Sequence, residues 1–139
     1  MREYPKPHLI EFPKFGDSAV GYVSAAESSK NIPFEVKRVF WTYYTPESIV
    51  RGRHAHHETE QILLAVAGRI IVTTETREGE VETFVLDNPH IGVYIPPDAW
   101  HTMQYSHVAV QLVLTSTYYD EADYIRDYKI FKSCESQKR

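Results

Sequence analysis

The side chains best suited to chemistry lie in one short stretch, Arg51-Gly52-Arg53-His54-Ala55-His56-His57-Glu58-Thr59-Glu60. On a β-strand, residues two apart project from the same face, so His54 and His56 should point together and His57 away from them. A later segment, Pro96-Pro97-Asp98-Ala99-Trp100-His101, adds a third histidine at the start of another predicted strand. Because imidazole can transfer protons near neutral pH and can also bind metals, the pattern predicts acid–base catalysis or a metal centre.

The metal hypothesis uses four side chains. Three imidazoles and a carboxylate suit Fe, Mn, Ni, Cu or Zn, as in a metal-dependent dioxygenase or sugar-phosphate isomerase. The candidate ligands are His54, His56, Glu60 and His101. The alternative that the paired histidines are merely packed or solvated is the least favoured, because a second histidine motif accompanies them.

The elements that must position these residues are predicted to be β-strands. Short runs rich in Val, Ile, Thr, Tyr and Phe recur between Pro, Gly, Asn and Asp residues, which is typical of a sandwich or barrel. Arg77-Glu78-Gly79 predicts a hairpin, and Asp87-Asn88-Pro89 cannot continue a central strand, so antiparallel pairing is favoured. Strands are predicted near Leu9–Phe12, Tyr22–Ala25, Val36–Tyr43, Glu60–Ala67, Arg69–Thr76, Glu80–Leu86, Val93–Ile95, Ala99–Tyr105 and Ala109–Thr115.

The segment from Tyr118 to Phe131 breaks the strand pattern. Its apolar residues Tyr124, Ile125, Tyr128 and Phe131 recur at three- and four-residue steps, as they would on one face of a helix. The spacing predicts a short C-terminal helix, or helical turns, packed on the barrel.

Composition predicts one globular unit. With 139 residues, 42% of them apolar and 24% charged, the chain should form a single domain over 1–139 with a frayed tail at 135–139. A formal charge of −4 without a Lys or Arg run argues against nucleic-acid binding, and no segment approaches the ~20 apolar residues of a membrane span. No apolar signal segment is seen, so a cytoplasmic location is expected. Cys134 lies in a polar tail and is interpreted as an unused thiol.

Two motifs resemble the signatures of the cupins. The stretch from His54 to Gly68 is similar to His-x-His-x3-Glu followed by a glycine, and Pro96 to His101 is similar to Pro-x-Gly-x-x-His with Asp98 in place of the glycine. The resemblance implies an all-β cupin fold, a double-stranded β-helix or jelly-roll barrel. The predicted C-terminal helical segment would pack on this barrel.

Further segments narrow the resemblance to one family. They look like the TDP-4-keto-6-deoxyglucose 3,4-ketoisomerases of the WxcM-like cupins, and the tyrosine-rich C-terminal motif is the most specific of them. The similarity runs from about Lys30 to Phe131. The matching segments are Asn31 to Val39, Arg51 to His56, Gly92 to Ile95, Trp100-His101 and Tyr118 to Arg126.

This resemblance implies an isomerase whose partner is a TDP-linked 4-keto-6-deoxy sugar. The keto group would move from C4 to C3 through an enediol or enediolate, without a metal ion or other cofactor. That chemistry requires only removal of the C3 proton and delivery of a proton to C4, which placed acid and base groups can perform. The resemblance also implies a place before amination at C3, in the biosynthesis of 3-amino-3,6-dideoxy sugars for a surface glycan such as O-antigen or S-layer glycan.

Individual roles follow from the same resemblance. His54 is the leading candidate for proton transfer at C3 and C4, and His56 is its partner at the sugar oxygens or the enediolate. Arg51 would hold the pyrophosphate, because guanidinium forms paired hydrogen bonds with phosphate oxygens. The further candidates for substrate binding are Arg38, His101 and Trp100.

Some features leave alternatives open. Val20 stands where members of the family carry Arg or Tyr, whereas His101 matches the galacto-forming type, so the C4 configuration of the product is not assigned. A non-catalytic sugar-binding cupin is a competing hypothesis, and so is a 3,5-epimerase, although that family lacks the tyrosine-rich tail. Small cupins commonly dimerise by strand exchange, and the apolar segment from Val36 to Tyr44 predicts such a homodimer.

Overall fold

The computed structural model describes residues 3–133, and within them nearly all regular structure is β-strand. The strands are β1 (His8–Glu11), β2 (Phe15–Asp17), β3 (Gly21–Val23), β4 (Arg38–Tyr43), β5 (Val50–His56), β6 (Gln61–Ala67), β7 (Ile70–Thr76), β8 (Val81–Leu86), β9 (Ile91–Ile95), β10 (Ala99–Tyr105), β11 (Val110–Thr115) and β12 (Tyr124–Ile125). A 3₁₀ helix, η1 (Glu121–Asp123), precedes β12, and a short helix, α1 (Tyr128–Ser133), follows it.

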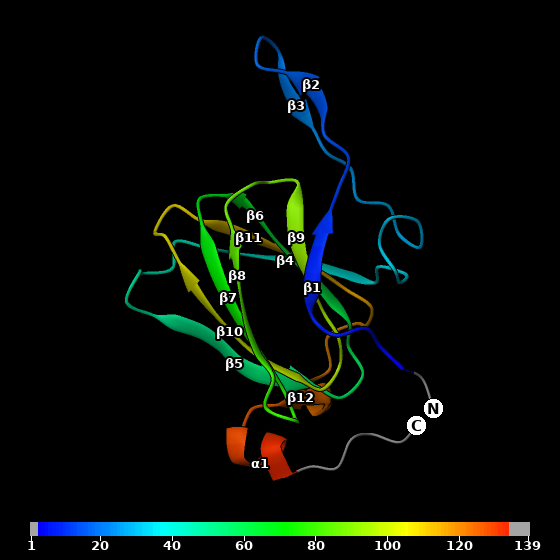
Figure 1. Cartoon of the computed structure of the whole chain (residues 1–139), viewed down its shortest axis with the longest axis vertical. Helices are drawn as coiled ribbons and strands as arrows, with labels where there is room; N and C mark the ends of the chain where they lie inside the picture. Colours follow the sequence, from blue (N-terminus) through cyan, green and yellow to red (C-terminus); the bar gives the residue numbers. More distant parts are fainter. Residues whose placement is uncertain (1–2, 134–139) are drawn as a thin grey trace.

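Two five-stranded sheets form the barrel (Figure 1). Their strand orders are β1-β9-β6-β11-β4 and β12-β5-β10-β7-β8, and every neighbouring pair is antiparallel. Inward-pointing side chains such as Leu63, Val72, Met103 and Val113 fill the space between the sheets, as the two-residue period of a strand requires. The all-β barrel with antiparallel pairing is therefore confirmed.

Segments outside the barrel cover the outer face of each sheet. Phe12 and Ile32 belong to an apolar cluster with Tyr94 on one sheet. Phe131 of α1 and Ile125 pack against Ala55 on the other, directly behind the strand that carries the paired histidines. The β2–β3 hairpin extends beyond the barrel at the end opposite α1 (Figure 1). The C-terminal segment thus fixes β5 from outside.

The C-terminal segment differs from its sequence prediction. Tyr124 and Ile125 form β12, which pairs with the end of β5, so the helical prediction holds only for the short helices on either side. The physical reason is that the edge of β5 presents backbone groups that need partners, and a two-residue strand satisfies them while burying Ile125. The α-helix starts at Tyr128, where the carboxylate of Asp127 accepts hydrogen bonds from the next backbone N–H groups.

Other expectations differ in smaller ways. The strand predicted at Tyr22–Ala25 is Gly21–Val23, in a hairpin with a β2 that the sequence did not predict. The tail predicted to fray, 135–139, and Cys134 lie outside the described residues. No helix within residues 3–133 is long and apolar enough to cross a membrane.

Asp98 explains why the second histidine motif tolerates a residue other than glycine. Its φ of +60° lies in the left-handed region, where glycine is normally favoured and Asp is one of the better substitutes. Its N–H donates to the carbonyl of His56 at 2.7 Å, and its carboxylate pairs with the guanidinium of Arg77 at 2.7 Å. The pair offsets the cost of the conformation.

This pairing gives a stability prediction. Asp98→Ala keeps the left-handed backbone and leaves the buried Arg77 side chain without its carboxylate, so we expect a loss of roughly 2–4 kcal/mol in the free energy of unfolding. Asp98→Gly should lose about 1 kcal/mol less, because it removes the backbone strain. Urea unfolding of both variants measures the difference. Equal midpoints for the alanine variant and the wild type would contradict the argument.

Candidate active site

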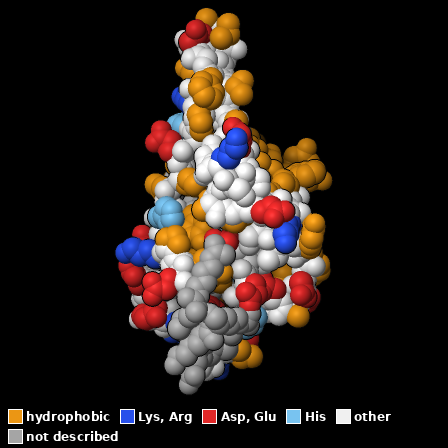
Figure 2. Space-filling model, turned by 90° about the vertical axis from the view of Figure 1, so that its right-hand side faces the viewer, with side chains coloured by type: hydrophobic (Ala, Val, Ile, Leu, Met, Phe, Trp, Pro, Cys, Tyr) orange, Lys and Arg blue, Asp and Glu red, His pale blue; other side chains and the backbone are white. Residues whose placement is uncertain are grey.

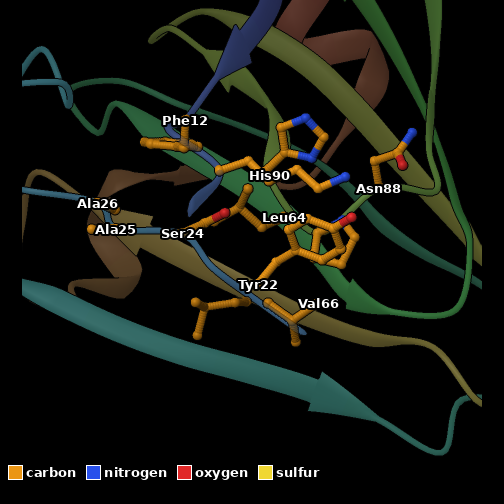
Figure 3. A pocket seen from close by; sticks show the side chains of 12 residues that line it. Phe12, Tyr22, Ser24, Ala25, Ala26, Leu64, Val66, Asn88 and His90 are labelled. Carbon is orange, nitrogen blue, oxygen red and sulfur yellow. The ribbon is translucent and has the colours of Figure 1, made fainter. Parts of the chain in front are cut away.

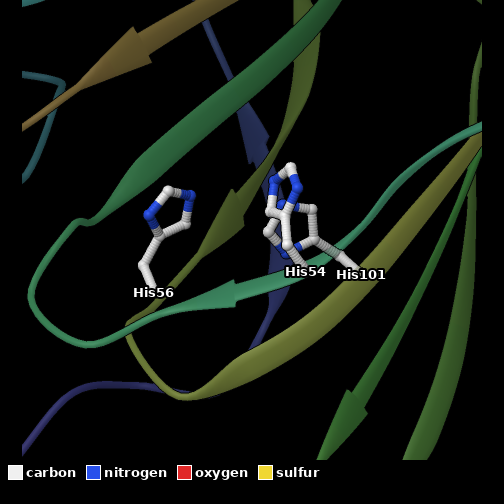
Figure 4. Close-up of side chains that lie close together, drawn as sticks. All are labelled: His54, His56 and His101. Atoms are coloured by element: carbon white, nitrogen blue, oxygen red, sulfur yellow. The ribbon is translucent and has the colours of Figure 1, made fainter. Parts of the chain in front are cut away.

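A pocket of about 200 Å³ opens into the barrel between the two sheets. His54 and His101 lie in its wall beside Arg51, Gln111 and Tyr124, and apolar side chains form much of the rest. The rings of His54 and His101 lie close together, whereas His56 stands further along β5 (Figure 4). Histidine and arginine side chains in one narrow pocket make this the site with the chemistry that the sequence predicts.

The pairing of β5 with β10 places His54 in the pocket. His101 and His54 face each other across the two strands, and the register then shifts between His101 and Thr102. Gly52 and Arg53 have positive φ values of 83° and 60° at this irregularity. A bulge of this kind bends a strand and redirects its side chains. A Cβ on Gly52 would lie 2.9 Å from the carbonyl oxygen of His101, so this position requires glycine.

The three imidazoles form one cluster. Ring centroids are 4.7 Å apart for His54 and His101, 5.2 Å for His54 and His56, and 6.1 Å for His56 and His101. The two residues on β5 thus lie together, as their spacing predicts, and the third comes from the partner strand β10. Tyr124 covers the pair from β12, with its ring 4.4 Å from that of His56 and 5.1 Å from that of His54.

Burial keeps two of these histidines neutral. Loss of solvation, and after it the charges that His101, His56 and Arg126 can carry, lower the pKa of His54 to about 2. Burial, and then His56, lower the pKa of His101 to about 4. The Nδ1 atom of His101 lies 3.0 Å from the carbonyl oxygen of Ala99, so Nδ1 carries the proton and Nε2 is left as the acceptor. Near pH 7 the pocket therefore presents neutral imidazoles, the form in which histidine is a base.

The lowered pKa values predict acid sensitivity. In the unfolded chain both histidines should titrate near ~6.5. As pH falls below that value, the unfolded state therefore binds protons that the folded state does not bind. Stability should then fall by up to about 1.4 kcal/mol per pH unit for each histidine. The loss continues to about pH 4 for His101 and further for His54.

Urea unfolding between pH 7.5 and 4.5 measures this slope. The His101→Asn variant, which keeps an N–H near the position of Nδ1, should show a shallower decline than the wild type. The same slope in both proteins would contradict a neutral, buried His101.

His56 occupies a more enclosed position than His54. Its side chain is 2% exposed, and its Nδ1 atom lies 3.1 Å from a carboxylate oxygen of Asp123. Its Nε2 atom lies 3.3 Å from the amide nitrogen of Gln61. Gln61 lines the pocket, whereas His56 lies behind the wall. The predicted partner of His54 is therefore held by fixed neighbours at both ring nitrogens.

Geometry supports only part of the four-ligand metal hypothesis. Within residues 3–133, a cluster with metal-binding spacing contains His54, His56 and His101, with one ligand atom from each lying within 4.8 Å of the others. Glu60 is outside this cluster, and its carboxylate accepts a hydrogen bond from the hydroxyl of Tyr94 at 2.7 Å. Three imidazoles have the donor chemistry for a transition metal, although Nε2 of His56 already faces Gln61.

The predicted substrate-binding residues have different positions. Arg51 and His101 line the pocket, and Arg38 and Trp100 are not among the described residues that do. Arg38 instead donates a hydrogen bond to Thr115 at 3.3 Å from the edge strand β4. Trp100 packs outside the barrel, with its ring 5.7 Å from that of Phe131. The structure thus gives Arg38 and Trp100 structural contacts.

Three site residues escaped the sequence-based prediction. Asp123, Tyr124 and Arg126 all lie in the tyrosine-rich motif, which was interpreted as a family signature and as a helical segment packed on the barrel, with none of its residues assigned to the site. Arg126 lines the pocket, stacks on Tyr124 at 4.1 Å and forms a two-point ion pair with Glu121. The signal that could have located them is the density of charged and aromatic residues in that motif.

A larger cavity of about 540 Å³ lies outside the barrel (Figure 3). It is bounded by the N-terminal segment, including Phe12 and Tyr22, and by the outer face of β6 and β11, including Leu64 and Leu112. Its lining is mainly apolar, and two members of the histidine cluster of the described residues, His54 and His101, line the other pocket. We therefore place the chemistry inside the barrel.

Comparison with known proteins finds curated and solved relatives of this chain. A curated TDP-4-oxo-6-deoxy-alpha-D-glucose-3,4-oxoisomerase from Aneurinibacillus thermoaerophilus is 42% identical over 126 residues, which cover 89% of this chain and 88% of the relative. The structure is similar to QdtA, a sugar 3,4-ketoisomerase from Thermoanaerobacterium thermosaccharolyticum in complex with TDP, with a TM-score of 0.86, 34% identity and coverage of 91% of this chain and 92% of that one.

A second solved structure that is similar to this one is also that of a 3,4-ketoisomerase. It is WlaRB, a TDP-quinovose 3,4-ketoisomerase from Campylobacter jejuni, with a TM-score of 0.84, 35% identity and coverage of 91% of this chain and 96% of that one. The FdtA family model, described as WxcM-like, C-terminal, matches residues 5–136. Since the model spans almost all of the sequence, this chain belongs to the WxcM-like family.

Proposed function

We propose that this protein is an isomerase that converts a TDP-linked 4-keto-6-deoxy sugar, TDP-4-keto-6-deoxyglucose, to its 3-keto isomer. The single observation that carries the proposal is the cluster of His54, His56 and His101 at a pocket between the sheets. The names of the relatives, all 3,4-ketoisomerases, supply the substrate class. The neutral state of His54 suits a base.

The reaction needs two proton transfers on carbon and a redistribution of protons on oxygen. His54 removes the proton from C3, and the electron pair moves toward the C4 carbonyl to give an enediolate. Protonation at C4, with transfer of a proton from the C3 hydroxyl to the C4 oxygen, then leaves a ketone at C3 and a hydroxyl at C4. Each proton taken from the sugar is matched by one delivered to it, so no oxidant, reductant or other co-reactant is consumed.

The substrate would enter with its sugar toward the histidines and its diphosphate at the mouth. Arg51 is exposed and lines the pocket, which places a guanidinium where it can form paired hydrogen bonds with phosphate oxygens. Tyr124 and His101 would flank the sugar ring. Arg38 and Trp100 are not part of this proposal because they do not line the pocket.

The proposal is tested with chelator-treated protein and TDP-4-keto-6-deoxyglucose in deuterated water, with the sugar protons followed by NMR. We expect a 3-keto product with deuterium at C4, and its coupling constants will give the gluco or galacto configuration. Activity that appears only after a transition metal is restored would favour the metal-dependent alternative. Binding without turnover or exchange would favour a non-catalytic sugar-binding protein.

The product suggests the next step in the pathway. A 3-keto sugar presents a carbonyl that condenses readily with an amine, so we propose that an aminotransferase uses this product to make a 3-amino-3,6-dideoxy sugar for a surface glycan. A coupled assay with a sugar 3-aminotransferase and glutamate should give a 3-amino product only when this protein is present. The cytoplasmic location stays a prediction.

We also propose that the protein works as a homodimer formed through β4 and the N-terminal hairpin. Strand β4 is at the edge of its sheet and exposes Val39, Trp41 and Tyr43. The hairpin carries exposed Phe15 and Val23, and Figure 2 shows apolar side chains gathered along it. An open strand edge beside exposed apolar side chains favours association with a second copy.

Oligomeric state tests this arrangement directly. Trp41→Glu should shift the sedimentation coefficient from that of a dimer to that of a monomer. Val85→Glu, at a similarly exposed apolar position on β8, should have no such effect. A wild-type monomer at micromolar concentration would contradict the proposal.

A further inference from the structure

Asp123 lies behind the pocket and has no role in the reaction described above. We infer that it is a positioning residue, which holds His56 in the tautomer with the proton on Nδ1 and so leaves Nε2 as the nitrogen that accepts a proton during turnover. The catalytic part of this inference rests on the proposed function. The tautomer itself can be measured without any assay of activity.

Contacts at both ring nitrogens indicate the same tautomer. Nδ1 of His56 lies 3.1 Å from a carboxylate oxygen of Asp123, and an ionised carboxylate can only accept, so Nδ1 carries the hydrogen. Nε2 lies 3.3 Å from the amide nitrogen of Gln61, and that nitrogen can only donate, so Nε2 offers its lone pair. Side chains of His56 and Asp123 are 2% and 10% exposed, so water competes little for either contact.

The carboxylate is itself held in place. One oxygen accepts the backbone N–H of Glu58 at 2.7 Å, and the other accepts both the N–H and the hydroxyl of Thr59. Burial raises the pKa of Asp123, but the hydrogen bonds from His56 and Thr59 outweigh burial and hold it below the ordinary value. Asp123 therefore stays ionised, and it cannot rotate without breaking the turn between β5 and β6.

The two catalytic histidines, His54 and His56, therefore have different electrostatic surroundings. A positive charge on His56 would lie beside a carboxylate, whereas Nδ1 of His54 is buried without a hydrogen-bond partner among the described residues. Ligand nitrogens of the two rings lie within 4.8 Å, a gap that a sugar oxygen can bridge. His56 can therefore take a proton from a sugar oxygen that replaces the amide of Gln61 at Nε2, while neutral His54 acts on carbon, and each proton taken is matched by one delivered to the substrate.

The experiment is two-bond ¹H–¹⁵N correlation NMR of histidine rings in chelator-treated wild type and Asp123→Asn. Wild-type His56 should be protonated on Nδ1. In the variant a neutral amide replaces the carboxylate beside Nδ1, so the Nδ1–H form should lose its preference and the Nε2–H form should appear. We expect kcat to fall about tenfold or more while KM stays within about twofold, as when a residue that orients a catalytic histidine is lost.

Asp120→Asn is the matched control. It removes the same charge three residues earlier, from a side chain that accepts the N–H of Ala122, and should leave tautomer and kcat unchanged. Wild-type His56 protonated on Nε2, or an Asp123→Asn variant with wild-type kcat, would overturn the inference. If that variant does not fold, the wild-type spectrum decides. An inactive wild type would contradict the proposed function, whereas the spectrum tests the tautomer independently.

Discussion

Replacing His54 with asparagine should lower kcat for 3,4-ketoisomerisation by roughly 10²- to 10⁴-fold, the usual contribution of a positioned proton-transfer group. The amide is close to imidazole in size, but it cannot accept a proton at neutral pH. Because His54 is neutral and lines the pocket, the loss should fall on turnover, with KM nearly unchanged. Initial rates with TDP-4-keto-6-deoxyglucose, followed by NMR, provide both constants.

Deuterium exchange sharpens this test. The His54→Asn variant should also fail to exchange the C3 proton of bound substrate, which separates loss of proton abstraction from slow product release. His107→Asn, at an exposed position outside the pocket, is the control and should keep wild-type rates. A His54→Asn variant that exchanges and turns over normally would remove this residue from the mechanism.

Replacing Arg51 with glutamine should raise KM for the TDP-sugar by about 10- to 100-fold, since a hydrogen bond to a charged group contributes roughly 1.5–3 kcal/mol and each 1.4 kcal/mol is a factor of ten. The change should leave kcat within a few-fold, because Arg51 lies at the pocket wall and would contact phosphate. Titration with TDP alone should show the same loss of affinity, which locates the effect on the nucleotide.

Arg53→Gln is the matched control for that experiment. Arg53 is two residues away on the same strand and equally basic, but it does not line the pocket. Its replacement should therefore leave KM close to the wild-type value. The same KM in Arg51→Gln and wild type would exclude Arg51 from phosphate binding, and equal losses in both variants would indicate a general effect of positive charge.

The sequence by itself determined most of the strands and the two histidines on β5, although β2, β12 and the bounds of β5 were not predicted. Alternation of apolar and polar residues, and turn signals such as Arg77-Glu78-Gly79, are local properties, so they predict strands and hairpins directly. His54 and His56 are two residues apart on one strand, and that spacing alone brought them together. The same reasoning was wrong for Tyr124 and Ile125, because a helical spacing in a short segment does not reveal that a free strand edge lies nearby.

Only the tertiary structure decided which residues share the pocket. Asp123 meets His56 across 67 positions of sequence, and a bulge at the β5–β10 register redirects the side chains around His54, neither of which any local pattern encodes. Trp100 and His101 are neighbours in sequence, yet one packs under α1 and the other lines the pocket. Strand pairing and register determine these positions, because they bring together residues that are far apart in the chain.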